Sequence, residues 1–146
     1  MKKAIFYLCS LTLFVFASCT KDEQPVDVRL PFLGVWQVEE EYSINGAAQI
    51  HDSYEVTVTT SAAGESIVLV SNFGNFNKTI QFEIKDNGAD FSIPSQAINI
   101  PLGGVQYEFN LSGSGHLQGS AKMEYSYVAA ATAGGVITGD CVATKK

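Results

Sequence analysis

Apolar and polar residues alternate along most of the chain from residue 32 onward. Trp36, Val38 and Tyr42, for example, are separated by polar residues such as Gln37 and Glu39. Because successive side chains of a β-strand point to opposite faces, this period of two predicts strands with one buried face. No stretch shows a helical period, so we expect an all-β protein. The predicted strands cover residues 36–44, 54–59, 67–70, 80–85, 91–93, 105–111, 117–128 and 136–144.

Short turns join these segments. Asn45-Gly46 and Asn87-Gly88 supply the positive φ angles that tight hairpin turns require. About eight antiparallel strands connected in sequence predict a meander that closes into a β-barrel, because closure leaves no unpaired edge strand. A β-sandwich is the alternative architecture. The glycine-rich stretch 113–119 predicts a sharp bend or bulge at the entry to the seventh strand.

The first residues carry the pattern of a secretory signal. Lys2 and Lys3 form a positive segment, and residues 4–17 are uncharged and mostly apolar. A membrane-spanning helix needs about 20 apolar residues, so this run is too short to span. Two small residues, Ala17 and Ser18, then precede Cys19. We therefore expect residues 1–18 to be a signal peptide that is removed.

The sequence Phe16-Ala17-Ser18-Cys19 resembles the lipobox of bacterial lipoproteins, although Phe16 replaces the usual aliphatic residue. The resemblance implies that Cys19 becomes the lipid-bearing N-terminus, as in lipoproteins of the Bacteroidota. Residues 19–31 are polar and show no periodicity, which predicts a tether between the lipid and the folded domain. Several acyl chains on one cysteine would hold the protein on a membrane, since each buried methylene contributes about 0.8 kcal/mol.

Three charged residues in the tether bear on localisation. Lys21, Asp22 and Glu23 follow Cys19 closely and resemble the surface-export signal of Bacteroidota lipoproteins. The alternative interpretation is a solvated charge cluster in a linker. The first interpretation predicts a lipid-anchored protein on the outer surface of the bacterial outer membrane, and the second leaves the periplasmic face open.

Composition sets limits on the folded part. After removal of residues 1–18, 128 of the 146 residues remain, enough for one domain, which we place at residues 32–146. Loss of Lys2 and Lys3 leaves seven basic against 15 acidic residues, a formal net charge of −8. Such an acidic chain is a poor candidate for nucleic-acid binding, which selects basic surfaces. Cys141 is the one cysteine not removed or lipidated, so we expect a buried thiol.

The sequence offers no recognisable catalytic constellation. It lacks a Gly-x-Ser-x-Gly nucleophile motif and a Cys-x-x-Cys pair. His51 and His116 are far apart, and no spacing typical of metal ligands occurs. We therefore expect neither an enzyme nor a bound cofactor or metal.

The first strand carries a second resemblance. Gly34-Val35-Trp36 is similar to the Gly-x-Trp signature of lipocalins and fatty-acid-binding proteins. Together with the lipobox cysteine and the eight-strand meander, it resembles the lipocalin-like lipoproteins of the Bacteroidota. The resemblance implies that Trp36 closes one end of a barrel that holds a small apolar ligand. Two features depart from it. Lipocalins place an arginine of a late strand over the tryptophan, whereas the one arginine here, Arg29, precedes Trp36. Fatty-acid-binding proteins have a helical lid after the first strand, and none is predicted here.

Glu40 stands out on the first strand because it shares the parity of Trp36 and Tyr42, which predicts the core face. A buried carboxylate is costly unless it is paired. In one interpretation, Glu40 and Tyr42 line a ligand cavity. In the favoured interpretation, a bulge or a strand end returns Glu40 to solvent. The sequence predicts a non-catalytic binding module, with a structural protein that contacts an envelope partner or glycan as the alternative.

Overall fold

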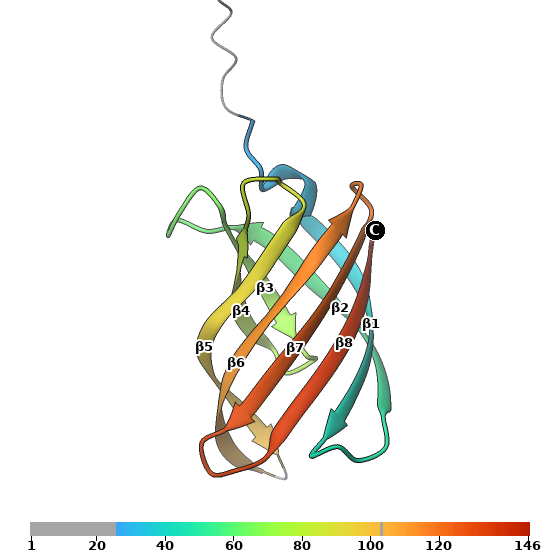
Figure 1. Ribbon diagram of the computed structural model, residues 1–146, viewed down its shortest axis with the longest axis vertical. Coiled ribbons are helices and arrows are strands. Elements are labelled where there is room, and N and C mark those ends of the chain that lie inside the picture. The colour runs from blue at the N-terminus through green and yellow to red at the C-terminus, as the bar shows by residue number, and fades with distance from the viewer. Residues whose placement is uncertain (1–25, 103) are drawn as a thin grey trace, which may run out of the picture.

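The protein is a closed eight-stranded β-barrel (Figure 1). The computed structural model describes residues 26–102 and 104–146. A short 3-10 helix, η1 (Leu30–Phe32), precedes the barrel. The strands are β1 (Gly34–Ile44), β2 (Ile50–Thr60), β3 (Ile67–Phe73), β4 (Lys78–Ile84), β5 (Asp90–Leu102), β6 (Val105–Gln118), β7 (Lys122–Ala131) and β8 (Val136–Lys145). Among the described residues, no helix has the length and apolarity needed to cross a membrane.

Each strand pairs antiparallel with the next, and β8 closes the circle by pairing with β1. The β1–β8 ladder is long, running from Trp36 opposite Lys145 to Ile44 opposite Ile137. The predicted all-β meander is therefore confirmed as a barrel, and the sandwich alternative is wrong. Closure satisfies the backbone groups of the first and last strands, which would otherwise form exposed edges.

One end of the barrel is closed by the segment that precedes β1, at the top of Figure 1. Trp36 and Phe32 are fully buried there, and Trp36 Nε1 donates a 2.7 Å hydrogen bond to the Phe32 carbonyl. The ammonium of Lys145, from β8, lies 5.4 Å from the centre of the Trp36 ring and donates to the Pro31 carbonyl. A late-strand cation therefore does cover this tryptophan, but it is a lysine rather than an arginine.

The segment before η1 already belongs to the folded domain. Arg29 forms an ion pair with Asp27 and donates from its guanidinium to the carbonyls of Ser61 and Gly64 in the β2–β3 connection. Hydrogen bonds from Arg29 lower the pKa of Asp27 to about 2. Residues 27–31, which the sequence assigned to the tether, thus contact the barrel, and the domain begins before residue 32.

Aromatic rings fill the interior between the closed end and the middle of the barrel. Phe82 and Phe91 stack at 4.8 Å, and Phe82 meets Tyr125 edge to face at 5.6 Å. Such pairs contribute about 0.5–1.5 kcal/mol beyond the area they bury. The barrel is therefore largely filled by its own side chains in this half.

Glycines on the interior faces of β6 and β8 make room for these rings. A Cβ at Gly115 would collide with Phe91 and Tyr125, and one at Gly139 would collide with the ring of Tyr127. The bend predicted for residues 113–119 occurs at Gly119, which has a positive φ in the turn that enters β7. The prediction is wrong for residues 113–118, because β6 pairs with β7 in unbroken register from Phe109 to Gln118. The glycines of β6 provide space for neighbouring aromatic side chains, and the chain turns only after the strand has ended.

The fifth strand is much longer than the segment 91–93 predicted from its alternation. Pro94 cannot donate to a ladder, and the β5–β6 register shifts between Ile93 and Gln96. The side chain of Gln96 then makes hydrogen bonds to the backbone of Gln81 in β4, in place of backbone pairing. A side-chain bridge thus extends the β4–β5 seam beyond its backbone ladder.

Candidate functional site

The four residues expected to govern anchoring and export lie outside the described residues: Cys19, Lys21, Asp22 and Glu23. Lipidation at Cys19 and surface display stay predictions. The site that the structure does describe is at the barrel end opposite to η1, at the bottom of Figure 1, where the β1–β2, β5–β6 and β7–β8 hairpins gather. We call this end the mouth.

A cavity of about 160 Å³ opens at the mouth. Its polar wall is formed by Glu40 of β1, Asp52 of β2 and Asn75 of the β3–β4 turn. A water molecule occupies about 30 Å³ in the liquid, so the cavity holds roughly five waters or a ligand group of similar bulk. Pockets for drug-sized ligands are typically about 300–1,000 Å³, so a long acyl chain does not fit in this volume alone.

The remaining walls are aromatic and aliphatic. Tyr42, Phe76 and Tyr127 supply three aromatic rings. The aliphatic residues are Ile44, Leu102 and Ile137, which also line a second hollow of about 150 Å³ next to the cavity. A polar end and an apolar end are therefore adjacent, which suits a ligand with both kinds of surface.

Glu40 is on the interior face of the barrel and is only 2 % exposed. The bulge that would have returned it to solvent is absent, because β1 pairs in regular register with Asp52 of β2 and Cys141 of β8 at this position. The favoured prediction, that Glu40 returns to solvent, was therefore wrong. Glu40 lines the cavity, as the alternative interpretation predicted. The alternation of β1 continues through Glu40, so its side chain points into the barrel, as those of Trp36 and Val38 do.

A short hydrogen bond from Tyr127 anchors the buried Glu40 carboxyl. Tyr127, from β7, donates to Glu40 Oε1 at 2.5 Å. Burial raises the pKa of Glu40, and the hydrogen bond from Tyr127 partly opposes the rise. Among the described residues, no salt bridge includes Glu40, so no side-chain cation compensates its charge.

Three further polar groups lie beneath the carboxyl. Tyr54 and Tyr125 are 5 % and 4 % exposed, and their hydroxyls have no hydrogen-bond partner among the described residues. Tyr54 is close enough to Glu40 to lower its pKa, although its hydroxyl makes no hydrogen bond of good geometry. Cys141 is a buried free thiol, as predicted, and burial raises its pKa. Tyr54, Tyr125 and Cys141 thus form a buried polar cluster next to the carboxyl.

Trp36 and Tyr42 lie towards opposite ends of the barrel. Tyr42 lines the mouth cavity, whereas Trp36 is fully buried at the closed end. The interior beside Trp36 is packed with side chains, and the mouth cavity does not reach it. Trp36 therefore closes the barrel and does not contact a ligand in the mouth.

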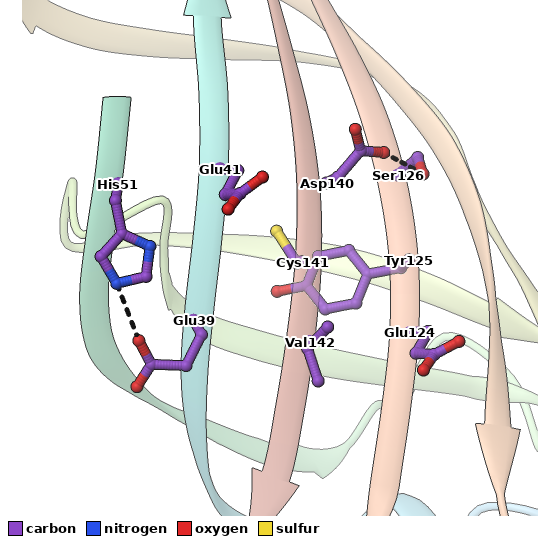
Figure 2. A pocket seen from close by; sticks show the side chains of 9 residues that line it. All are labelled: Glu39, Glu41, His51, Glu124, Tyr125, Ser126, Asp140, Cys141 and Val142. Carbon is purple, nitrogen blue, oxygen red and sulfur yellow. Dashed lines mark hydrogen bonds and ion pairs between the residues drawn. The ribbon is translucent and has the colours of Figure 1, made fainter. Parts of the chain in front are cut away.

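A hollow of about 450 Å³ lies on the outer wall and is shown in Figure 2. Its charged side chains project from the solvent side of β1, β2, β7 and β8, with His51 paired to Glu39 at 3.1 Å and Ser126 donating to Asp140 at 2.6 Å. His116 makes a separate pair with Asp90, whose pKa it lowers. Within the described part of the chain, no three His, Cys, Asp or Glu residues gather in a way that could hold a metal ion. The outer hollow is a solvated acidic face.

Sequence reasoning missed Asp52, Asn75 and Phe76. Asp52 shares the parity of Tyr54 and Val56, so the alternation that identified Glu40 could have identified it too. Asn75 and Phe76 belong to the β3–β4 turn, which a meander places at the same end as the β1–β2 turn. No sequence signal showed that these two residues would line a cavity there. Asn75 donates to Asp52 at 3.3 Å, which connects the turn to β2.

Comparisons with known proteins give little further information. No protein-family model and no curated protein matches the sequence. One similar solved structure is that of a protein of unknown function from the DUF3598 family of Nostoc punctiforme, with 12 % identity and a TM-score of 0.47. The similarity covers 80 % of this chain and 48 % of the other, so the chain spans about half the length of that protein.

Proposed function

We propose that the protein is a non-catalytic binding module of the bacterial envelope, a lipocalin-like lipoprotein anchored through Cys19, and that its barrel mouth takes a small ligand. The observation that supports this proposal is the mouth cavity with the buried Glu40 carboxyl in its wall. A concave site with mostly apolar walls and a few convergent polar groups is typical of small-molecule binding.

The cavity also limits the ligand. Its volume of about 160 Å³ admits a head group or a short molecule, while the adjacent hollow beside Ile44 and Leu102 can cover a short apolar extension. A ligand that is apolar throughout would leave the Glu40 carboxyl buried and without solvent, which is unfavourable. We therefore narrow the small apolar ligand implied by the resemblance to a small amphiphile.

The arrangement suits a protein on a lipid anchor. The chain enters the barrel at the closed end, and the mouth is at the opposite end (Figure 1). A lipid on Cys19 would attach to the closed end, so the mouth would face away from the membrane. If the protein is displayed on the cell surface, its ligand comes from outside the cell.

Native mass spectrometry of the protein purified from its own envelope tests the proposal. We expect a small molecule retained by the wild-type protein and lost from Leu102→Trp, which places a large ring in the mouth. Val128→Trp is the matched control, because Val128 is exposed on the outer wall of β7. A wild-type protein that carries no small molecule, or one that Leu102→Trp retains equally well, would contradict ligand binding in the mouth.

A second candidate function has one observation in its favour. Exposed aliphatic and aromatic side chains gather around the mouth, including Ile44, Tyr107 and Val136, which line the same hollow. Exposed apolar surface of this kind also occurs where proteins dock. Cross-linking in whole cells from a photoreactive residue at position 107 distinguishes the two: a specific protein adduct supports a partner protein, and its absence supports the small ligand.

A further inference from the structure

We propose that the ligand of the mouth cavity carries a protonated amine, which binds the free oxygen of the Glu40 carboxylate, on a short aliphatic chain that occupies the apolar side of the mouth. This inference rests on the proposed function and names the chemical class of its ligand.

The polar groups of the cavity call for a hydrogen-bond donor. The two acidic side chains of the wall, Glu40 and Asp52, are carboxyls, and no lysine or arginine is among the lining residues. The hydroxyl of Tyr42 and the amide of Asn75 are further polar groups of the wall, and both are neutral. Tyr127 already directs its proton to Glu40 Oε1, so it offers the cavity no free donor. An ammonium group supplies three donors and no acceptor, whereas a carboxylate ligand supplies acceptors only.

The charge of the cavity also favours a cationic ligand. Glu40 is 2 % exposed, and no cation of the described chain pairs with it. An uncompensated buried carboxylate is costly, and a cation brought by the ligand would relieve that cost. The hydroxyl of Tyr54 lowers the pKa of the same carboxyl, but it does not line the cavity and brings no positive charge.

The aromatic walls fit a cation as well. Tyr42, Phe76 and Tyr127 line one small cavity together with the carboxyls. The negative faces of aromatic rings attract ammonium groups within about 6 Å, and sites for amine ligands combine such rings with carboxylates. Ile44, Leu102 and Ile137 then provide an apolar surface for the attached carbon chain.

Ligand-observed NMR with three probes of equal chain length tests the inference. The protein is the predicted mature chain from residue 19, with Cys19→Ser to leave it unlipidated, which retains every described residue. n-Butylamine, n-butanol and butyrate are titrated separately at pH 7. We expect saturation transfer to n-butylamine, with an affinity at least about tenfold higher than that of n-butanol, and no transfer to butyrate.

Variants connect this binding to the mouth. Glu40→Gln retains the shape of the side chain and an acceptor for Tyr127, and we expect it to weaken n-butylamine binding at least about tenfold. Glu41→Gln makes the same charge change on the outer face and should leave binding unchanged. Thermal unfolding followed by circular dichroism confirms that both variants are folded.

The contradicting outcomes separate failure of the amine inference from failure of ligand binding in the mouth. Binding of n-butanol or butyrate as tight as that of n-butylamine, and lost in Leu102→Trp, overturns the amine inference but leaves ligand binding in the mouth intact. Equal n-butylamine affinity in the wild type and in Glu40→Gln overturns the amine inference too. Absence of binding by all three probes overturns it and also counts against the proposed function.

Discussion

Tyr127 and Glu40 meet across an intervening strand. They belong to β7 and β1, and β8 lies between these strands in the barrel. The ring of Tyr127 passes over Gly139 of β8, where even a Cβ would collide with it. Since Gly139 pairs with Tyr42 on one side and Tyr127 on the other, the absence of a side chain at this position allows the hydroxyl to reach the carboxyl. The polar wall of the mouth therefore depends on a glycine.

Tyr127→Phe removes the hydrogen bond that Tyr127 donates to the buried Glu40 carboxyl. We expect the free energy of unfolding to fall by about 1–3 kcal/mol, because Glu40 keeps its desolvation cost without the donor. Urea unfolding at pH 7 measures the change. Tyr107→Phe, the same substitution at a tyrosine exposed at the rim, is the control and should change stability by less than about 0.5 kcal/mol. Equal effects of the two substitutions would show that the Tyr127–Glu40 contact contributes nothing.

Gly139→Ala tests the space beneath the Tyr127 ring. We expect a loss of about 1–3 kcal/mol, since the added methyl group must push the ring aside and lengthen its contact with Glu40. The loss should shrink in a Tyr127→Ala background, where no ring is present. A double-mutant cycle by urea unfolding measures this coupling, and additive effects would contradict the role assigned to Gly139.

Glu40→Gln should alter how stability depends on pH. Burial raises the folded-state pKa of Glu40 above its unfolded value near 4.5, so its contribution to stability is present below about pH 4.5 and lost as pH rises through the folded-state pKa. Each pKa unit of elevation corresponds to about 1.4 kcal/mol. We therefore expect Glu40→Gln to become increasingly more stable than wild type from pH 5 to pH 8.

The groups around Glu40 do not obscure this comparison. Burial raises the pKa values of Tyr54, Tyr125, Tyr127 and Cys141, so they stay neutral in this window. The charge of Asp52 also raises the pKa of Glu40, so the difference between wild type and Glu40→Gln includes the repulsion between these two carboxyls. Urea unfolding at several pH values provides the measurement, with Glu41→Gln as control. Parallel pH profiles for wild type and Glu40→Gln would contradict the raised pKa.

Trp36→Ala tests the closed end. Truncation of a fully buried aromatic residue costs about 3–5 kcal/mol, a large part of the about 5–15 kcal/mol that stabilises a small domain. Trp36 is the one tryptophan in the sequence, so its fluorescence reports on this position alone. We expect blue-shifted emission that moves to the red on unfolding. Native emission at the solvent-exposed wavelength, with a mild effect of Trp36→Ala, would place Trp36 outside the core.

The alternation of the sequence predicted the strand count, the meander and the core face of β1, because period two and hairpin turns are local signals. It underestimated the length of β5, since Pro94 and the register shift after Ile93 interrupt the alternation while the strand continues. It misinterpreted Gly113 and Gly115 as bend signals, because their true role depends on aromatic side chains from neighbouring strands.

The candidate site was predictable only in part. Parity placed Glu40 and Tyr42 inside, but the cost of a buried carboxylate favoured a bulge, and no local signal showed that Tyr127 would supply a donor from 87 residues away. Lys145 was missed as the cation over Trp36 for the same reason, because β1 meets β8 only on barrel closure. Long-range pairing decides these contacts, and a single sequence does not display it.

A crystal structure of the unlipidated mature chain grown with n-butylamine tests amine binding at Glu40 directly. We expect the amine in the mouth, with its nitrogen within hydrogen-bond distance of the Glu40 oxygen that Tyr127 leaves free and its carbon chain against Leu102 and Ile137. The crystals are grown at an amine concentration that saturates the NMR signal. A mouth that then holds only ordered water, with the amine bound elsewhere, would contradict amine binding at Glu40.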